Sequence, residues 1–279
     1  MQAFRTLFQT VIALAVFLPG FWATTAVAQK SSLPVDLELV LAVDVSGSID
    51  PDEARLQRDG YVAALTDPAV VKAISGGILG RVAMTYIEWA GEEYTTTVAD
   101  WTMVEDEASA RAFAATVARA PIQTALWTSI SNIIDHALST FPGNGFEGTR
   151  RVIDISGDGP NNQGGLVTKF RDRAVAQRVA INGLPIVNER ASPFGWPALP
   201  NLDLYYANCV IGGPGSFMVV ANTFADFARA IRKKLILEIA DARPYSPQER
   251  IILAAGPKPP RETPPCDIGE QRVQWLLEN

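Results

Sequence analysis

A short, almost unbroken run of apolar residues near the amino terminus most restricts the fold of this chain. The run from Leu37 to Val43 contains a single charged residue, Glu38, and ends at Asp44, where a Ser/Gly turn begins. A strand that is apolar on both faces is typical of a parallel sheet covered by helices on both sides. Asp50 and Pro51 follow as an N-cap and a first-turn proline, so we expect a helix after the turn.

The remainder of the domain alternates between segments that favour strands and segments that favour helices, with no internal repeat. This alternation predicts a Rossmann-like α/β fold, an open and mostly parallel sheet with helices on both faces. Strands are expected at 81–89, 94–98 with 101–104 as an edge, 151–155, 180–187 and 204–211. Helices are expected from residue 51 and at 105–118, 129–138, 168–179 and 223–239.

The amino terminus has the layout of a bacterial secretory signal peptide. Arg5 is the only charge in residues 1–28, an apolar run covers 11–18, and small residues end at Ala28. We expect cleavage there, which places the mature chain in the periplasm or outside the cell. An uncleaved anchor is the alternative, but the run is shorter than the roughly 20 apolar residues that span a bilayer. No later stretch is apolar enough to be a stable membrane span.

Composition divides the mature chain into a domain at 34–240 and a proline-rich tail at 241–279. We expect the tail to be extended, with the apolar residues at 275–277 docking it on the domain. Cys209 and Cys266 are the two cysteines. In an oxidising compartment they either form a disulfide that clips the tail to the domain or remain separate thiols.

Charge and histidine content bear on the class of function. The formal net charge is −6, and no run of Lys or Arg suggests a nucleic-acid partner. His136 is the only histidine and lies within an expected helix, where it favours packing or solvation over catalysis. Glu88 is interpreted as an exposed strand end, and the Gly-rich segment at 212–215 as a tight turn rather than an anion site.

Oxygen-bearing side chains gather where the first strand ends. Asp44, Ser46 and Ser48 occupy alternate positions directly after it. Ligands of open α/β sheets bind at the carboxyl ends of the strands, so this loop faces the expected binding crevice. One carboxylate and two hydroxyls suit a hard divalent cation, and Mg²⁺ favours about six oxygen ligands. Mn²⁺ and Ca²⁺ also accept such ligands. A plain strand-to-helix turn is the alternative interpretation.

Two further candidate ligands come from the ends of other elements. Asp158 follows the strand at 151–155, in the same strand-to-turn position as Asp44. Thr128 directly precedes the helix expected at 129–138. Both side chains face the same crevice if their strands neighbour the first one.

These motifs together resemble the metal-ion-dependent adhesion site of von Willebrand factor type A (VWA) domains. The likeness consists of a DxSxS motif at 44–48, a distant Thr, and Ser-Gly-Asp-Gly at 156–159, and it extends over 36–240. The segments 151–162 and 209–215 are similar to those of an uncharacterised bacterial subgroup of secreted VWA proteins.

The resemblance implies a role for each residue of the site. Ser46 and Ser48 would ligate the metal through their hydroxyls, and Thr128 would do so in the ligand-competent state. Asp44 and Asp158 would bind it directly or through water, and a carboxylate from a partner would fill the sixth position. In the family a small residue, usually Gly, precedes the Thr. Trp127 stands there in this chain, so Thr124 remains a rival to Thr128.

The function indicated is an exported, metal-dependent protein-binding module without catalytic residues. Its partner would be an unknown exported or envelope protein that offers an Asp or Glu to the metal. The alternative is a metal-dependent hydrolase or phosphatase with Asp44 as the nucleophile. Phosphatases of the haloacid dehalogenase type require a second Asp two residues after the nucleophilic Asp, and this chain has Ser46 at that position.

Overall fold

The computed structural model describes residues 32–187, 197–223, 226–240, 251–253 and 261–278. The expected signal peptide at 1–28 lies outside these residues. Among the described residues, no helix combines the length and apolar character needed to cross a membrane.

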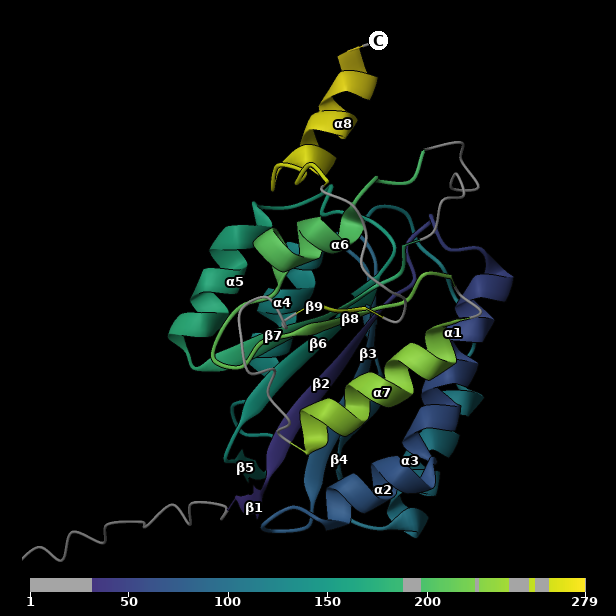
Figure 1. Cartoon of the computed structure of the whole chain (residues 1–279), viewed down its shortest axis with the longest axis vertical. Coiled ribbons are helices and arrows are strands. Elements are labelled where there is room, and N and C mark those ends of the chain that lie inside the picture. Colours follow the sequence, from purple (N-terminus) through teal and green to yellow (C-terminus); the bar gives the residue numbers. More distant parts are fainter. Residues whose placement is uncertain (1–31, 188–196, 224–225, 241–250, 254–260, 279) are drawn as a thin grey trace, which may run out of the picture. The chain divides into compact units, whose positions relative to one another are not determined.

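A seven-stranded sheet lies at the centre of the described region (Figure 1). Its order is β4-β3-β2-β6-β7-β8-β9, and each neighbouring pair is parallel except β3 with β4. This arrangement confirms the predicted fold class, and β4 lies at the edge of the sheet as expected. The strands are β2 (Leu37–Asp44), β3 (Val82–Trp89), β4 (Thr95–Val104), β6 (Arg151–Gly157), β7 (Val179–Pro185), β8 (Met218–Val220) and β9 (Ile251–Leu253). A separate parallel pair joins β1 (Leu33–Val35) to β5 (Phe146–Gly148).

Helices cover both faces of this sheet and form two apolar layers with it. One face carries α1 (Pro51–Leu65), α2 (Pro68–Ser75), α3 (Glu107–Arg119) and α7 (Phe227–Ile239). The other carries α4 (Ile130–Thr140), α5 (Val167–Ala176), α6 (Leu202–Tyr205) and the π-helical turn η1 (Tyr206–Val210).

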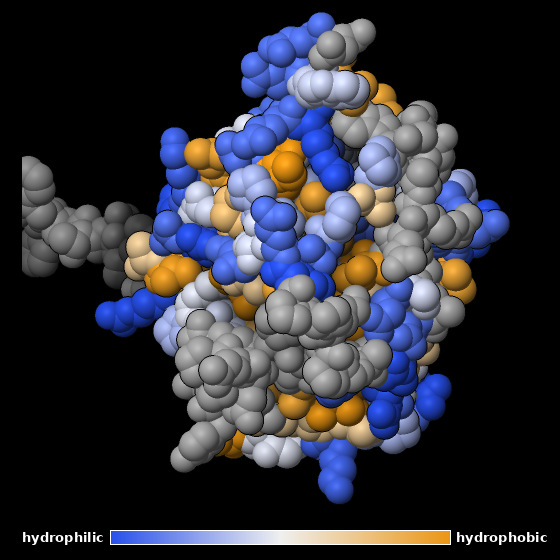
Figure 2. All heavy atoms as spheres, turned by 45° about the horizontal axis from the view of Figure 1, so that its top comes forward, coloured by the Kyte–Doolittle hydropathy of each residue, from blue (hydrophilic) through white to orange (hydrophobic). Residues whose placement is uncertain are grey.

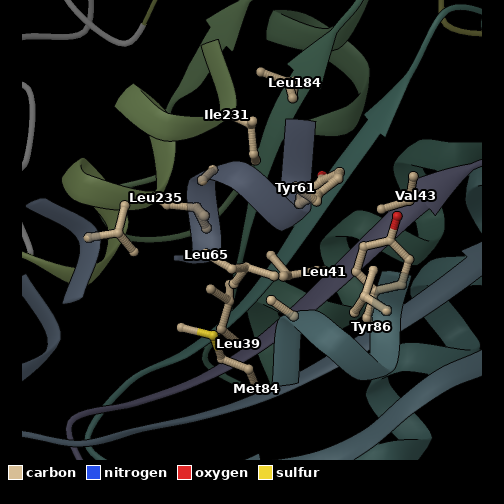
Figure 3. Close-up of a cluster of buried hydrophobic side chains, with 14 of the residues drawn as sticks. Leu39, Leu41, Val43, Tyr61, Leu65, Met84, Tyr86, Leu184, Ile231 and Leu235 are labelled. Carbon is tan, nitrogen blue, oxygen red and sulfur yellow. The ribbon is translucent and has the colours of Figure 1, made fainter. Parts of the chain in front are cut away.

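Strand β2 is buried along its whole length because it contributes to both layers. Leu39 and Leu41 face the layer of α1 and α7, where they lie near Leu65 of α1 (Figure 3). Val40 belongs to the opposite layer. Burying one such aliphatic side chain stabilises the fold by about 1.5–3 kcal/mol, so the apolar run is central to the core.

Helix α1 begins at the predicted N-cap. The Asp50 carboxylate accepts hydrogen bonds from the N–H groups of Asp52 and Glu53, at 2.9 and 2.8 Å. The Glu53 carboxylate in turn accepts one from the Asp50 N–H at 3.1 Å. This capping box ends the loop that begins at Asp44, so it fixes the length of that loop.

The prediction of a strand at 204–211 is wrong. These residues form the end of α6 and the π-helical turn η1 instead. Tyr205, Tyr206, Cys209 and Val210 are all fully buried, which gives an apolar run without visible alternation. Such a run fits a buried strand and a buried helix equally well, and the short strand β8 takes the expected place in the sheet.

The carboxyl-terminal tail also differs from the expected extended segment. Its last part is a helix, α8 (Ile268–Glu278). Trp275 and Leu277, in this helix, are 64% and 81% exposed. Cys266, just before the helix, is bonded to Cys209 with a Cα–Cα distance of 5.4 Å, so the disulfide is the alternative that the structure supports.

Candidate metal centre

The loop after β2 orients the first carboxylate of the site. The Ser46 N–H donates a 2.7 Å hydrogen bond to Asp44 Oδ1, a local turn that Asp favours two residues before an amide. The Gln57 side chain of α1 donates to the Asp44 carbonyl at 3.2 Å. Asp44 and Ser46 are both fully buried, so the loop is held at the upper end of β2 in Figure 1.

Three side chains from two separate strand ends meet at this loop. Ser46 Oγ and Ser48 Oγ lie 3.0 Å apart, and Ser48 Oγ donates to Asp158 Oδ1 at 2.5 Å. Asp158 reaches this position because β6 pairs directly with β2 in the sheet. The structure therefore brings together four of the residues expected from the sequence, including Asp44 at the base.

Thr128 lies in a third loop, which is hydrogen-bonded to the loop after β6 and to the end of β3. Its N–H donates to Asn162 Oδ1 and its carbonyl accepts from the Asn162 N–H, both at 2.8 Å. The next residue, Ser129, donates its N–H to the carbonyl of Ala90 after β3, at 2.7 Å. The Thr128 hydroxyl lies 3.8 Å from the point where a Cβ on Gly159 would stand. Thr128 therefore adjoins the Asp158 loop.

The rival Thr124 does not share this arrangement. Its side chain is exposed, whereas Thr128 is 4% exposed. Ala125 instead pairs with the β2 exit, because its N–H donates to the Val45 carbonyl at 3.1 Å. Of the two threonines, the geometry favours Thr128 as the residue beside the site.

The backbone at Trp127 has a conformation that favours a small residue. The φ angle of Trp127 is +66°, in the left-handed region that glycine adopts freely and a bulky residue adopts only under strain. Neighbouring Gly91 is packed so closely that a Cβ there would lie 2.8 Å from the Leu126 carbonyl and 3.1 Å from Trp127 Cβ. Glycine would therefore occupy position 127 without strain, whereas the bulky Trp127 does not.

The ionised forms of the two carboxylates, Asp44 and Asp158, are disfavoured in this environment, so both pKa values are raised. Burial, and then the negative charge of Asp158, raise the pKa of Asp44 well above its ordinary value. Burial raises the pKa of Asp158 to about 6, against the hydrogen bond from Ser48, and the charge of Glu53 adds to the rise. Two such carboxylates favour a bound cation or a proton.

The residues present fit a hard divalent cation. Within the described part of the chain, Asp44 Oδ2 is buried and accepts no hydrogen bond, so it retains a free lone pair. A Cβ on Gly157 would stand 2.7 Å from this oxygen and 2.8 Å from the Tyr206 hydroxyl, so only glycine fits there. The described residues contain no metal-binding group of three or more His, Cys, Asp or Glu side chains. The site instead combines three hydroxyls with two carboxylates, so every candidate ligand atom is an oxygen.

Some residues that hold the loops of the site could not be recognised from the sequence. Glu88, expected to be exposed, is 3% exposed and forms an ion pair with the Arg58 guanidinium, which also donates to the Ala120 carbonyl. Burial raises the pKa of Glu88 despite this arginine.

Asn161 and Asn162 end the segment 151–162, but the sequence indicates no role for them at the site. Asn162 holds Thr128, and Asn161 contacts Ser131 and Glu270. These partners are distant in sequence, so no local pattern could have indicated them.

Solved structures with the same fold identify the class of this domain. Proximal thread matrix protein 1 of the mussel byssus is 12% identical, with a TM-score of 0.55 over 75% of this chain and 49% of that one. A second structure of that protein, whose metal-ion-dependent adhesion motif holds zinc, is 14% identical, with a TM-score of 0.51 over 74% and 46%. The pilus adhesin SpaC of Lactobacillus rhamnosus GG is 12% identical, with a TM-score of 0.52 over 76% and 32%. The chain spans about half or less of each of these proteins.

A von Willebrand factor type A protein from Catenulispora acidiphila is 12% identical, with a TM-score of 0.50 over 74% of this chain and 43% of that one. The described domain therefore has the VWA fold. By sequence, the chain belongs to the family described as "Protein of unknown function (DUF1194)", whose model matches residues 34–243. No curated protein matches the sequence.

Proposed function

We propose that this chain is a metal-dependent protein-binding module, which grips an acidic group of a partner through a bound divalent cation. The cation would be held by Asp44, Ser46, Ser48, Thr128 and Asp158. Mg²⁺ suits this set of oxygen donors best, and Mn²⁺ or Ca²⁺ would substitute.

One observation carries this proposal: the contact chain from Ser46 through Ser48 to Asp158, beside the unpartnered Asp44 Oδ2. These contacts gather oxygen donors around the buried Asp44 and the partly buried Asp158, two carboxylates of raised pKa. A cation would relieve the repulsion between these carboxylates and complete their coordination. A purely structural turn gives no reason to place a second carboxylate, Asp158, near the buried Asp44.

The charge of the donor set supports an acidic partner group. Only two of the protein ligands would be negatively charged, because the hydroxyls add no charge. The cation would therefore remain electrophilic, and a partner's Asp or Glu would form a short charge-assisted contact with it. In the fold relatives, zinc occupies the corresponding motif of the mussel matrix protein, and SpaC is a pilus adhesin.

The surface beside the site suits a protein partner. Leu126 and Trp127 are 59% and 40% exposed and directly precede Thr128. Figure 2 turns the α8 end of the domain forward and shows apolar patches scattered over a mainly hydrophilic face. A mixed surface of this kind is typical of partners that bind and release. With the signal-peptide layout of 1–28, the partner would be an exported or envelope protein.

The hydrolase alternative gains no support from the site. Its nucleophile would be Asp44, which is fully buried and whose Oδ1 is bound to the Ser46 N–H. We therefore do not propose it as a second function.

A metal titration followed by affinity capture tests the proposal. Mg²⁺ or Mn²⁺ should raise the melting temperature of the wild type and leave Asp44→Ala unchanged, since a ligand at 100 times its Kd adds about 2.7 kcal/mol. Asp59→Asn changes an exposed carboxylate on α1 and serves as the matched control. Envelope proteins captured with Mg²⁺ should be released by EDTA and absent with Asp44→Ala. Equal melting of the wild type with and without metal would overturn the proposal.

A further inference from the structure

We propose that the carboxyl-terminal segment 261–270 positions the metal site through Asn161, so that the Cys209–Cys266 disulfide sets the affinity for metal. This inference rests on the proposed metal-binding function. It assigns a role to the tail, which lies beyond the part of the chain that resembles a VWA domain.

Asn161 joins the metal loop to three other elements. It is fully buried, and its Oδ1 accepts a 2.9 Å hydrogen bond from the Ser131 N–H at the start of α4. Its own N–H donates to the Tyr205 hydroxyl of α6 at 3.1 Å. Its Nδ2 donates to Glu270 Oε1 of α8 at 2.7 Å. The position of Asn161 therefore depends on α4, α6 and α8 together.

A shift of Asn161 would be transmitted to two proposed metal ligands. The next residue, Asn162, holds Thr128 through two hydrogen bonds of 2.8 Å: its Oδ1 accepts from the Thr128 N–H, and its own N–H donates to the Thr128 carbonyl. Asp158 lies three residues before Asn161 in the same loop. Partners one step removed from a metal fix the orientation of its ligands, so Asn161 acts as a positioning residue.

The start of α8 lies directly against this loop. A Cβ added to Gly269 would stand 1.8 Å from the Asn161 carbonyl oxygen and 3.2 Å from Asn162 Cα. No other residue type fits unless the tail or the loop moves. The contact is therefore backbone against backbone, with Glu270 adding the side-chain hydrogen bond.

Two further links hold the segment in this place. Arg261 makes a paired contact with the buried Asp203 carboxylate, with both N–O distances at 2.7 Å. The Cys209–Cys266 disulfide attaches the segment to η1, whose Tyr206 hydroxyl lies beside Asp44 across Gly157. Cys266 is partly exposed, so a dithiol can reach the bond. Reduction transfers two electrons and two protons to the disulfide, gives two thiols, and leaves the dithiol as a disulfide.

The test compares Mg²⁺ affinity in variants that loosen the segment in different ways. Gly269→Ala and Glu270→Ala should each weaken Mg²⁺ binding measurably, by less than the roughly 10- to 100-fold found when a direct partner of a metal ligand is removed, because both act through Asn161. Glu270→Gln keeps an acceptor for Asn161 and should restore the affinity. Glu278→Ala, on the exposed end of the same helix, is the matched control. Dithiothreitol should weaken binding in the wild type and leave a Cys209→Ser/Cys266→Ser variant at its already reduced affinity.

A second measurement does not need the metal. Amide hydrogen exchange at Thr128 and Asn162 in the metal-free protein should accelerate with Glu270→Ala and on reduction, while core amides of β2 remain protected. Unchanged Mg²⁺ affinity and unchanged exchange in these variants would overturn the inference. If the wild type binds no Mg²⁺ yet exchange still accelerates, the proposed function fails and the positioning role stands.

Discussion

Ser48 Oγ donates a 2.5 Å hydrogen bond to Asp158 Oδ1 across 110 positions of sequence. The two residues meet because β2 and β6 are adjacent parallel strands, whose carboxyl ends open at the same edge of the sheet. The contact therefore depends on the completed sheet, and an isolated loop would not reproduce it.

The choice between the two threonines gives the first prediction. Thr128→Val removes the hydroxyl beside Gly159 at almost unchanged volume and should weaken Mg²⁺ binding at least 10-fold. Thr124→Val changes an exposed side chain and should bind Mg²⁺ as the wild type does. Calorimetric titration of both variants decides between them. Equal losses, or a loss in Thr124→Val alone, would contradict the assignment of Thr128.

Metal affinity should fall as the pH falls. Burial raises the pKa of Asp44 well above its ordinary value and takes that of Asp158 to about 6, so protons compete with the cation for Asp158 below about pH 6 and for Asp44 over its own raised range. Each competing proton weakens metal binding by about tenfold per pH unit below its pKa. Mg²⁺ titrations at pH 8, 6.5 and 5 measure this slope, with far-UV circular dichroism to check folding. A constant Kd from pH 8 to 5 would argue against carboxylate ligands.

The left-handed backbone at Trp127 predicts an inverted ranking of Gly and Ala. At φ +66°, Ala meets the steric penalty of the left-handed region and Gly does not. Trp127→Gly should therefore be more stable than Trp127→Ala by about 1 kcal/mol in urea denaturation. The same two substitutions at Trp101, within strand β4, should rank in the opposite order. Greater stability of Ala at position 127 would refute the strained conformation.

A buried ion cluster between the sheet and α7 predicts a pH-dependent stability. Lys234 lies between Asp154 and Glu238, and all three are fully buried. Burial, and then the charge of Glu238, raise the pKa of Asp154 to about 7 from an ordinary 3.8. Between these two values the folded state keeps a proton that the unfolded state has lost. The free energy of unfolding should therefore decrease as the pH rises from about 4 to 7, by up to about 4 kcal/mol.

Asp154→Asn tests this cluster, because asparagine can still accept a hydrogen bond from Lys234 but cannot ionise. In EDTA, the variant should lose less stability than the wild type between pH 4 and 7. Asp100→Asn, at an exposed position, should keep the wild-type slope. Parallel slopes in all three proteins would show that Asp154 ionises normally.

Most of the fold could be predicted because its strands are locally distinctive. The run at β2 and the strand–turn–helix order at Asp44 and Asp158 identify parallel strand ends without any long-range information. The segment at 204–211 could not be assigned, because complete burial removes the periodicity that separates a helix from a strand. The α8 helix was hidden by the prolines before it, the last of which is Pro265.

The candidate ligands were recognisable because the DxSxS motif concentrates three of them in five residues. Their supports were not, since Asn161 and Glu270 are joined across 109 positions by a contact that no pattern encodes. The Arg58–Glu88 pair is similar, as it links a helix to a strand end. Residue type and spacing indicate the chemistry of such a site, whereas the packing that holds it requires the structure.

The strained Trp127 also gives the protein a built-in optical probe. This residue is 40% exposed and directly precedes Thr128, while Trp89 is fully buried in the core. A partner that covers the site would move this fluorophore from water into an apolar environment and shift its emission toward the blue. Binding could then be followed without an attached dye, and Trp127→Phe would remove the signal while leaving the site in place.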